Sequence, residues 1–272
     1  MEEIGVSMSR ILTALIAVPL LLLVILKGPA WLFLALAMVF ALTGFWELSR
    51  LASKVGWKLL GVGYPLAALS VTAFYPGFPG FQETGLAILL AVGFTAVLTR
   101  EPGRETLGAV AATVFAVLYG GALLGTVVGL RMMPPEDLGR LRLVFLLAVV
   151  MVGDAGAYIV GRAFGKTPLA PVLSPKKTVE GLVGGIGFSV ATAVFLRQTA
   201  LTDLALATAV GLGLSMALLG VVGDLFESLL KRSAGIKDTS SLLPGHGGVL
   251  DRIDSLLFAA PFLFLYVKWV EL

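Results

Sequence analysis

The segment from Ser228 to Asp254, SLLKRSAGIKDTSSLLPGHGGVLDRID, gathers acids, bases, glycines and the only histidine of an otherwise oily chain. Only 14% of the 272 residues are charged and 58% are hydrophobic, so charged groups this dense are unusual here. Carboxylates beside ammonium and guanidinium groups suit the binding of a cation and of anionic phosphate. This segment is therefore the first candidate for a site that handles charged substrates.

Two pairs of acids, each three residues apart, lie in and just before this segment. Asp224 and Glu227 follow an uncharged run over residues 204–223, and their i, i+3 spacing puts them on one face of a helix. Asp251 and Asp254 repeat the spacing at the start of the last apolar stretch. The helix dipole favours one acid near an N-terminus, but it does not account for two pairs. Each pair is expected to point at one site.

Asp154 is the only charged residue between Arg142 and Arg162. A charge at such depth in a membrane is costly unless it is paired or hydrated, so Asp154 is expected to face a polar cavity. Asp154 and Asp224 are each expected to lie roughly 10–12 Å deeper in the membrane than the next basic residue along the chain, as calculated from the rise per residue of a helix. Carboxylates at one depth repel one another unless a cation lies between them, and oxygen ligands in a chain without cysteine suit Mg²⁺.

Mg²⁺ in turn implies phosphate, and two polar loops hold bases that would bind it. The alternative is that these bases only mark the cytoplasmic side of the membrane. Ser174 or Thr178 would cap a helix that begins after them, leaving free N–H groups facing an anion. His246 is open to three roles: a proton carrier, a donor to phosphate, or a locally bonded turn residue. The candidate bases are Lys166, Lys176, Lys177, Lys231, Arg232, Lys237 and Arg252.

The elements that must position these groups are membrane helices. Apolar runs recur along the chain beyond what one soluble core could bury, so they must face lipid. We predict an all-α, polytopic integral membrane protein with about nine transmembrane helices. The first window resembles a signal-peptide core but lacks a small-residue cleavage site, which predicts a retained span. The windows are residues 8–27, 30–50, 58–75, 84–99, 107–130, 143–163, 180–196, 204–229 and 252–270.

Charge sets the expected orientation. With a cytoplasmic N-terminus, most of the 20 basic residues lie on the cytoplasmic side, and so do the polar loops 162–179 and 230–251. We therefore expect a protein of the cell (cytoplasmic) membrane whose active site faces the cytoplasm. The net charge of +3 then reflects orientation, so nucleic acid is not expected as a partner.

The chain is expected to form a single membrane domain over residues 1–272. Its scaffold half would be residues 1–140 with helices 1–5, and its catalytic half residues 141–272 with helices 6–9 and the two polar loops. Glycines at helical spacing permit close helix packing, and a homodimer through such faces is a further hypothesis. These glycines are Gly121, Gly125, Gly129, Gly181 and Gly185.

The residues from 228 to 254 resemble the signature of the phosphatidate cytidylyltransferase family, also called CDP-diacylglycerol synthases. That signature runs Ser-x-apolar-Lys-Arg-x4-Lys-Asp-x-small-x2-apolar-Pro-x-His-Gly-Gly-apolar-x-Asp-Arg-apolar-Asp, and the segment matches it without a departure. The upstream runs GDAGAYIVGRAFGK and SPKKTVEG also look like family features. The resemblance therefore covers about residues 150–256, while the first 140 residues agree only in hydropathy.

The resemblance implies a reaction in which CTP and phosphatidic acid give CDP-diacylglycerol and pyrophosphate, using Mg²⁺, for phospholipid biosynthesis. We hypothesise that Asp224 and Asp251 ligate the principal metal, with Asp254, Glu227 and Asp154 as additional ligands. That many acids leaves room for a second cation. One substrate is cytosolic and the other is a membrane lipid, so a site just below the cytoplasmic boundary is where they would meet. The residues assigned to catalysis are Asp224, Asp251, Asp254 and His246, and those assigned to substrate binding are Lys166, Ser174, Lys176, Lys177, Thr178, Lys231, Arg232, Lys237, Asp238 and Arg252.

Two other function classes remain open. A CTP-dependent lipid kinase would use the same metal and bases but would transfer the γ-phosphoryl group to a lipid alcohol; the unbroken signature argues against it. A cation or proton transporter could also use Asp154 and Asp224, but its carboxylates would continue across the bilayer midplane. Asp203 and Glu83 lie near the far boundary, and the sequence does not connect them to the other acids.

Overall fold

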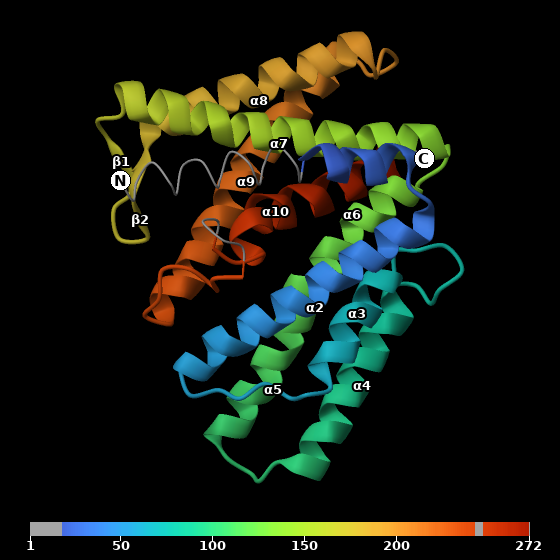
Figure 1. Cartoon of the computed structure of the whole chain (residues 1–272), viewed down its shortest axis with the longest axis vertical. Helices are drawn as coiled ribbons and strands as arrows, with labels where there is room; N and C mark the ends of the chain where they lie inside the picture. The colour runs from blue at the N-terminus through green and yellow to red at the C-terminus, as the bar shows by residue number, and fades with distance from the viewer. Residues whose placement is uncertain (1–17, 243–246, 272) are drawn as a thin grey trace. The chain divides into compact units, whose positions relative to one another are not determined.

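The computed structural model describes residues 18–242 and 247–271, and the chain forms two compact units (Figure 1). Unit 1 comprises residues 1–132 and 230–252, and unit 2 comprises residues 133–229 and 253–272. The single membrane domain with a division near residue 140 stays a prediction. Residues 228–254, which we call the signature segment, belong mostly to unit 1, together with the N-terminal helices.

Seven helices of the described residues are long and apolar enough to cross a membrane. They coincide with seven of the predicted windows, which confirms the all-α polytopic class. The window 58–75 contains instead α3, Gly63–Thr72, whose 10 residues span only about 15 Å of a roughly 30 Å hydrocarbon core. The window 8–27 is described only from residue 18, as the short apolar helix Val18–Lys27. The count of nine spanning helices is therefore not confirmed.

Unit 1 is a helical bundle around α2, Ala30–Lys54. α2 packs against α3 and against a continuous helix over residues 104–132. Close packing there depends on glycine, since a Cβ on Gly121 would lie 2.1 Å from the Ser70 Oγ of α3. The other elements of the bundle are α4, Phe81–Thr99; α5, Arg104–Val117; the π-helical turn η1, Leu118–Ala122; and α6, Leu123–Met132.

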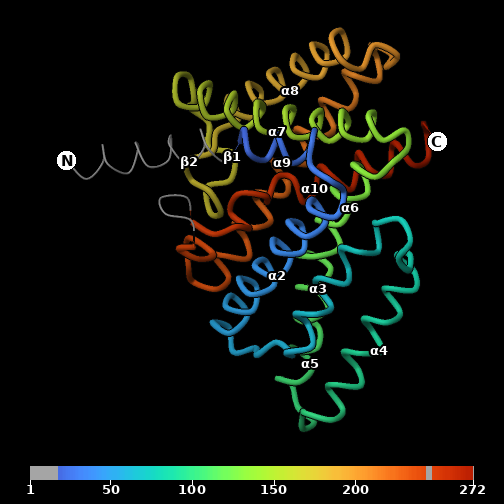
Figure 2. The backbone as a smooth tube through the Cα atoms, turned by 45° about the vertical axis from the view of Figure 1, so that its right-hand side comes forward, coloured from blue at the N-terminus to red at the C-terminus, as the bar shows by residue number. Residues whose placement is uncertain are grey.

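Unit 2 contains a pair of antiparallel helices joined by a small hairpin. α7, Glu136–Phe164, and α8, Val179–Thr199, lie side by side in Figures 1 and 2. Between them, β1, Pro168–Ala170, pairs antiparallel with β2, Ser174–Thr178. α9, Leu206–Ser233, belongs to unit 2 up to residue 229; α10, Leu250–Tyr266, and its π-helical extension η2, Val267–Glu271, belong to it from residue 253.

Three of the glycines suggested for a homodimer make close contacts inside their own units. A Cβ on Gly181 of α8 would lie 2.9 Å from the carbonyl oxygen of Ala157 on α7, and one on Gly185 would lie 3.0 Å from the Ala157 Cβ. Gly121 packs against α3 in the same way. Gly121, Gly181 and Gly185 thus permit close helix packing within their own units, and the homodimer stays a hypothesis.

Two loops lie together within unit 1. The Arg100 guanidinium donates to the Lys58 carbonyl at 2.7 Å, which joins the loop after α2 to the loop after α4. In unit 2, the Arg142 guanidinium and the Glu271 carboxylate pair at 2.7 Å and join the start of α7 to the end of η2. Each unit therefore has polar contacts that join segments of its own chain.

Candidate functional site

Asp224 and Lys177 form an ion pair in unit 2. Asp224 lies on α9 and Lys177 on β2, and their side chains are 31% and 27% exposed. A strand directs successive side chains to opposite faces, so Lys177 turns toward Asp224 while Lys176 stays exposed. The hairpin therefore selects one of two adjacent lysines for the carboxylate.

Asp154 of α7 and Asp254 of α10 lie near this pair. The carboxylates of Asp154, Asp224 and Asp254 are called the carboxylate cluster here, because Asp154 is close enough to interact electrostatically with Asp224, with Asp254 and with Lys177. A side-chain hydrogen bond joins Asp154 to Ser255, whose N–H donates to the Asp254 Oδ1 at 2.7 Å. Three of the predicted acids, carried by three different helices, are thus brought to one place in unit 2.

The chemistry of the carboxylate cluster suits a hard divalent cation. Its donors are carboxylate oxygens, and like charges this close favour a cation between them. Among the described residues, no three acidic or histidine side chains already converge as a ligand set. Glu227, predicted to point the same way as Asp224, is only 1% exposed. Its role as a metal ligand stays a prediction.

The hairpin is fixed to the start of α8 by two side chains. The Thr178 hydroxyl accepts a first-turn N–H of α8 at 3.1 Å, so Thr178 is the helix cap and Ser174 instead begins β2. The Glu180 carboxylate accepts the backbone N–H groups of Lys166 at 3.0 Å and of Thr167 at 3.2 Å. The backbone that carries Lys177 is therefore anchored at both ends, while the Lys166 side chain is exposed.

Asp251 organises the signature segment in unit 1. Its Oδ1 accepts from the Lys231 ammonium at 2.6 Å. Its Oδ2 accepts from the N–H and hydroxyl of Thr239, at 3.1 and 3.0 Å, and from the N–H of Gly248 at 2.8 Å. Asp251 thus ties the end of α9, the loop and the start of α10 together. Its role as the principal metal ligand stays a prediction.

Glu47, which lies on α2, is a second carboxylate that accepts hydrogen bonds from the signature segment. It was not among the residues predicted from the sequence. Glu47 is 0% exposed and accepts the Ser240 hydroxyl at 2.6 Å and the N–H groups of Val249 and Leu250 at 2.9 and 2.8 Å. The sequence did hold a signal, because Glu47 is the only charged residue in the run 28–49. An isolated acid in an apolar run is the pattern that drew attention to Asp154.

The remaining signature residues of unit 1 lie at its surface. The Arg232 guanidinium donates to the backbone carbonyl four residues further on, at 3.1 Å. Lys237, Asp238 and Arg252 are exposed. His246 lies outside the described residues. The substrate-binding and catalytic roles of these residues stay predictions.

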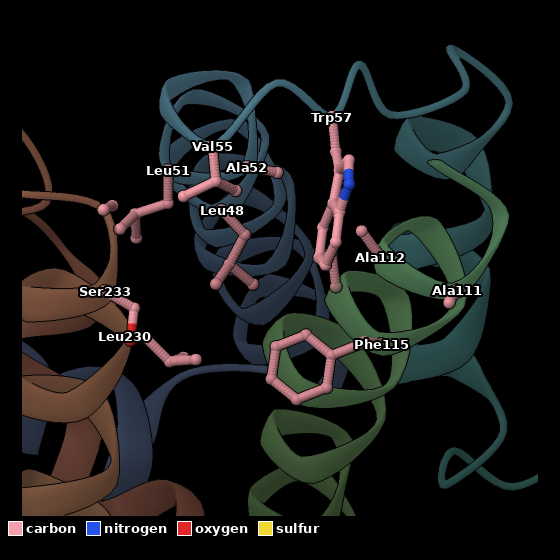
Figure 3. A pocket seen from close by; sticks show the side chains of 12 residues that line it. Leu48, Leu51, Ala52, Val55, Trp57, Ala111, Ala112, Phe115, Leu230 and Ser233 are labelled. Atoms are coloured by element: carbon pink, nitrogen blue, oxygen red, sulfur yellow. The ribbon is translucent and has the colours of Figure 1, made fainter. Parts of the chain in front are cut away.

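Unit 1 also contains an apolar pocket of about 300 Å³ beside α2, α5 and the end of α9 (Figure 3). Trp57 lines the pocket and packs against α5, where a Cβ on Gly108 would be 2.5 Å from the indole nitrogen. The polar side-chain groups in the lining are the Trp57 indole and the Ser233 hydroxyl. Phosphate needs charged or multiple donors, so its chemistry is not expected in this pocket.

Comparison with known proteins agrees with the signature. The chain matches a model described as "Cytidylyltransferase family" over residues 8–270. A phosphatidate cytidylyltransferase of Helicobacter pylori is 31% identical over 273 residues, which covers 100% of this chain and 96% of the relative. Another, from Staphylococcus saprophyticus, is 34% identical over 261 residues, covering 93% and 96% of the two chains. An uncharacterized Escherichia coli protein, YnbB, is 34% identical over 254 residues, covering 90% and 82%.

Proposed function

This chain belongs to the cytidylyltransferase family, and we propose that it transfers the cytidylyl group of CTP to phosphatidate, giving CDP-diacylglycerol and pyrophosphate. Relatives matched over nearly their whole length carry the name phosphatidate cytidylyltransferase. The structural observation that carries the proposal is the carboxylate cluster with Lys177 against it. It offers oxygen ligands for a cation and a base for phosphate in one place.

The proposed reaction is a displacement at phosphorus. A phosphate oxygen of phosphatidate attacks the α-phosphorus of CTP, and a new P–O bond forms. The bond from the α-phosphorus to the oxygen that bridges to the β-phosphorus breaks, and pyrophosphate leaves with that electron pair. The attacking phosphate is already ionised at neutral pH, so no strong general base is needed. Catalysis then depends on positioning and on offsetting negative charge.

The carboxylate cluster would hold Mg²⁺. Glu227 and Asp251 are further candidate ligands, and the number of acids would also allow a second cation. Mg²⁺, when bound, supplies positive charge to the triphosphate. Lys177 would donate to a phosphate oxygen at the edge of the cluster, because β2 already turns its ammonium to that side. Lys166 and Lys176, which are exposed on the same hairpin region, would attract the triphosphate at longer range.

We place this site at the cytoplasmic face of the cell membrane. The long apolar helices make the chain a membrane protein, and phosphatidate is a membrane lipid. CTP is a charged, water-soluble nucleotide, so the two substrates meet only near a membrane surface. The excess of basic residues in the loops 162–179 and 230–251 marks the cytoplasmic side. A homodimer remains part of this proposal.

Phosphatidate-dependent release of pyrophosphate tests the proposed function. Detergent-purified protein with CTP and Mg²⁺ is expected to release pyrophosphate when phosphatidate is present and not when diacylglycerol replaces it. EDTA is expected to stop the release, and excess Mg²⁺ to restore it. Equal release without phosphatidate, or full activity in EDTA, would contradict the proposal.

Lys177→Met is expected to lower kcat/KM for CTP about 100-fold, roughly 2.7 kcal/mol of transition-state stabilisation. The change removes the ammonium beside the carboxylate cluster but keeps an unbranched side chain. Lys176→Met is the matched control, because it removes the same charge from the opposite face of β2, and its loss is expected to stay within about tenfold. Initial rates of pyrophosphate release against CTP concentration measure both. Equal losses would contradict the role that the hairpin gives to Lys177.

A further inference from the structure

We infer that Glu47 is a positioning residue: its buried carboxylate, on the N-terminal helix α2, holds both sides of the signature segment in place. Residues 1–140 were expected to form the scaffold half, and Glu47 connects that half to the segment that identifies the family. The inference goes beyond the proposed function and depends on it only where activity is the readout.

Glu47 caps α10 from a different helix. The first N–H groups of a helix have no partner inside it, and α10 begins at Leu250. The Glu47 Oε2 accepts the N–H of Leu250 at 2.8 Å, and its Oε1 accepts the N–H of Val249 at 2.9 Å. A carboxylate at this end of a helix is also favoured by the helix dipole. Glu47 therefore fixes where α10 starts, immediately before Asp251.

The same carboxylate holds the other side of the loop. The Ser240 hydroxyl donates to the Glu47 Oε1 at 2.6 Å, and its oxygen accepts the N–H of Leu242 at 3.2 Å. The preceding residue, Thr239, donates to Asp251. Residues 239–242 and 247–250 are therefore held together by two carboxylates, one from inside the segment and one from α2.

The carboxylate of Glu47 fits this place closely and is satisfied there. Glu47 is 0% exposed, and Ser240 is 8% exposed. A buried carboxylate is costly unless it is hydrogen-bonded, and this one has three donors. The carboxylate approaches the backbone where Gly248 has no side chain, since a Cβ there would lie 2.3 Å from the Glu47 Oε1. The contact is thus built from a matched acid, hydroxyl and glycine.

Glu47→Gln tests the inference, because an amide has only one acceptor atom and its NH₂ group would face a backbone N–H. The chain has no cysteine, so single spin labels report local mobility directly. A label at Leu242→Cys reports the signature segment, and one at Val172→Cys, on the unit 2 hairpin and 86% exposed, serves as the control position. Glu47→Gln is expected to increase mobility at position 242 and leave position 172 unchanged.

Activity gives the second readout. In the otherwise unlabelled protein, Glu47→Gln is expected to lower kcat by about 10- to 100-fold, as for residues that orient a site, with KM for CTP changed by less than about threefold. Ser240→Ala, which removes one donor, is expected to act in the same direction more weakly, and the double variant to lose less than the product of the two losses. Glu105→Gln, at an exposed position on α5, is the matched control and is expected to match the parent.

Unchanged mobility at position 242 in Glu47→Gln would overturn the inference. So would an equal rise at position 172, because it would mean that the variant loosens the whole protein. The mobility measurement needs no turnover. The positioning role of Glu47 can therefore be confirmed or rejected even if the parent protein transfers no cytidylyl group. Failure of the proposed function and failure of this inference therefore give different results.

Discussion

Asp224→Asn is expected to lower cytidylyl transfer by at least about three orders of magnitude, which corresponds to roughly 4 kcal/mol of transition-state stabilisation. Asn keeps the shape of the side chain but removes its charge, so Lys177 loses its ion-pair partner and the proposed cation loses a carboxylate ligand. The fold is expected to persist, because the Asp224 and Lys177 side chains are both partly open to water.

The control for this variant is Asp203→Asn. Asp203 is an exposed acid of unit 2 in the loop between α8 and α9. This loop follows the end of α8 that is opposite to the hairpin joining α7 and α8. It is expected to keep parental activity and an unchanged temperature of thermal inactivation. Turnover by both variants is measured as phosphatidate-dependent pyrophosphate release. Activity in Asp224→Asn within about tenfold of the parent would remove Asp224 from the metal assignment.

Gly248→Ala is expected to lower activity by about 100-fold and to lower the temperature of thermal inactivation. A Cβ at this position would lie 2.0 Å from the Thr239 Oγ1 and 2.3 Å from the Glu47 Oε1. Both neighbours are buried, at 2% and 0% exposed, so neither can swing into solvent. Overpacking of this kind typically costs about 1–3 kcal/mol, and here it also displaces the hydrogen-bond partners of Asp251.

Gly85→Ala is the matched control for the crowding at Gly248. Gly85 lies on α4 of the same unit, and a Cβ there would meet no atom within 4 Å. Alanine is the better helix former by about 0.5–1 kcal/mol, so this variant is expected to be at least as stable as the parent and equally active. If Gly248→Ala kept the activity and thermal stability of Gly85→Ala, the close packing of Glu47 against the signature segment would be contradicted.

The membrane helices and the family could be predicted because their signals are local in sequence. Long apolar runs predict spans by length alone, and the signature occupies one unbroken segment. The match to the cytidylyltransferase family over residues 8–270 confirms the resemblance and extends it across the first 140 residues. The window 58–75 failed as a span because hydropathy does not register where a helix ends, and α3 has only 10 residues.

The gathering of Asp154 and Asp224 could also be anticipated, from helix rise and the position of the next basic residue. The choice between Lys176 and Lys177 could not, because it depends on a short strand inside a loop rich in proline. Strand alternation sends the two side chains to opposite faces, and only Lys177 pairs with Asp224.

The contacts of Glu47 were out of reach for a different reason. Its partners Ser240, Val249 and Leu250 are about two hundred residues away in the chain, and no helical or strand periodicity connects positions so distant. Asp251 shows the same limit. Its spacing to Asp254 suggests a shared role, but its hydrogen bonds to Thr239 and Gly248 arise only when the loop folds back on the start of α10.

The central claim is cytidylyl transfer to phosphatidate, and isotope position in the product tests it most directly. Purified protein is incubated with phosphatidate, Mg²⁺ and CTP labelled at either the α- or the γ-phosphate, and label is counted in the extracted lipid. We predict lipid labelled from α-labelled CTP only, because the α-phosphorus stays with the cytidylyl group while the γ-phosphate leaves in pyrophosphate. Lipid labelled only from γ-labelled CTP would mean a lipid kinase, and no labelled lipid from either would contradict the proposed transfer.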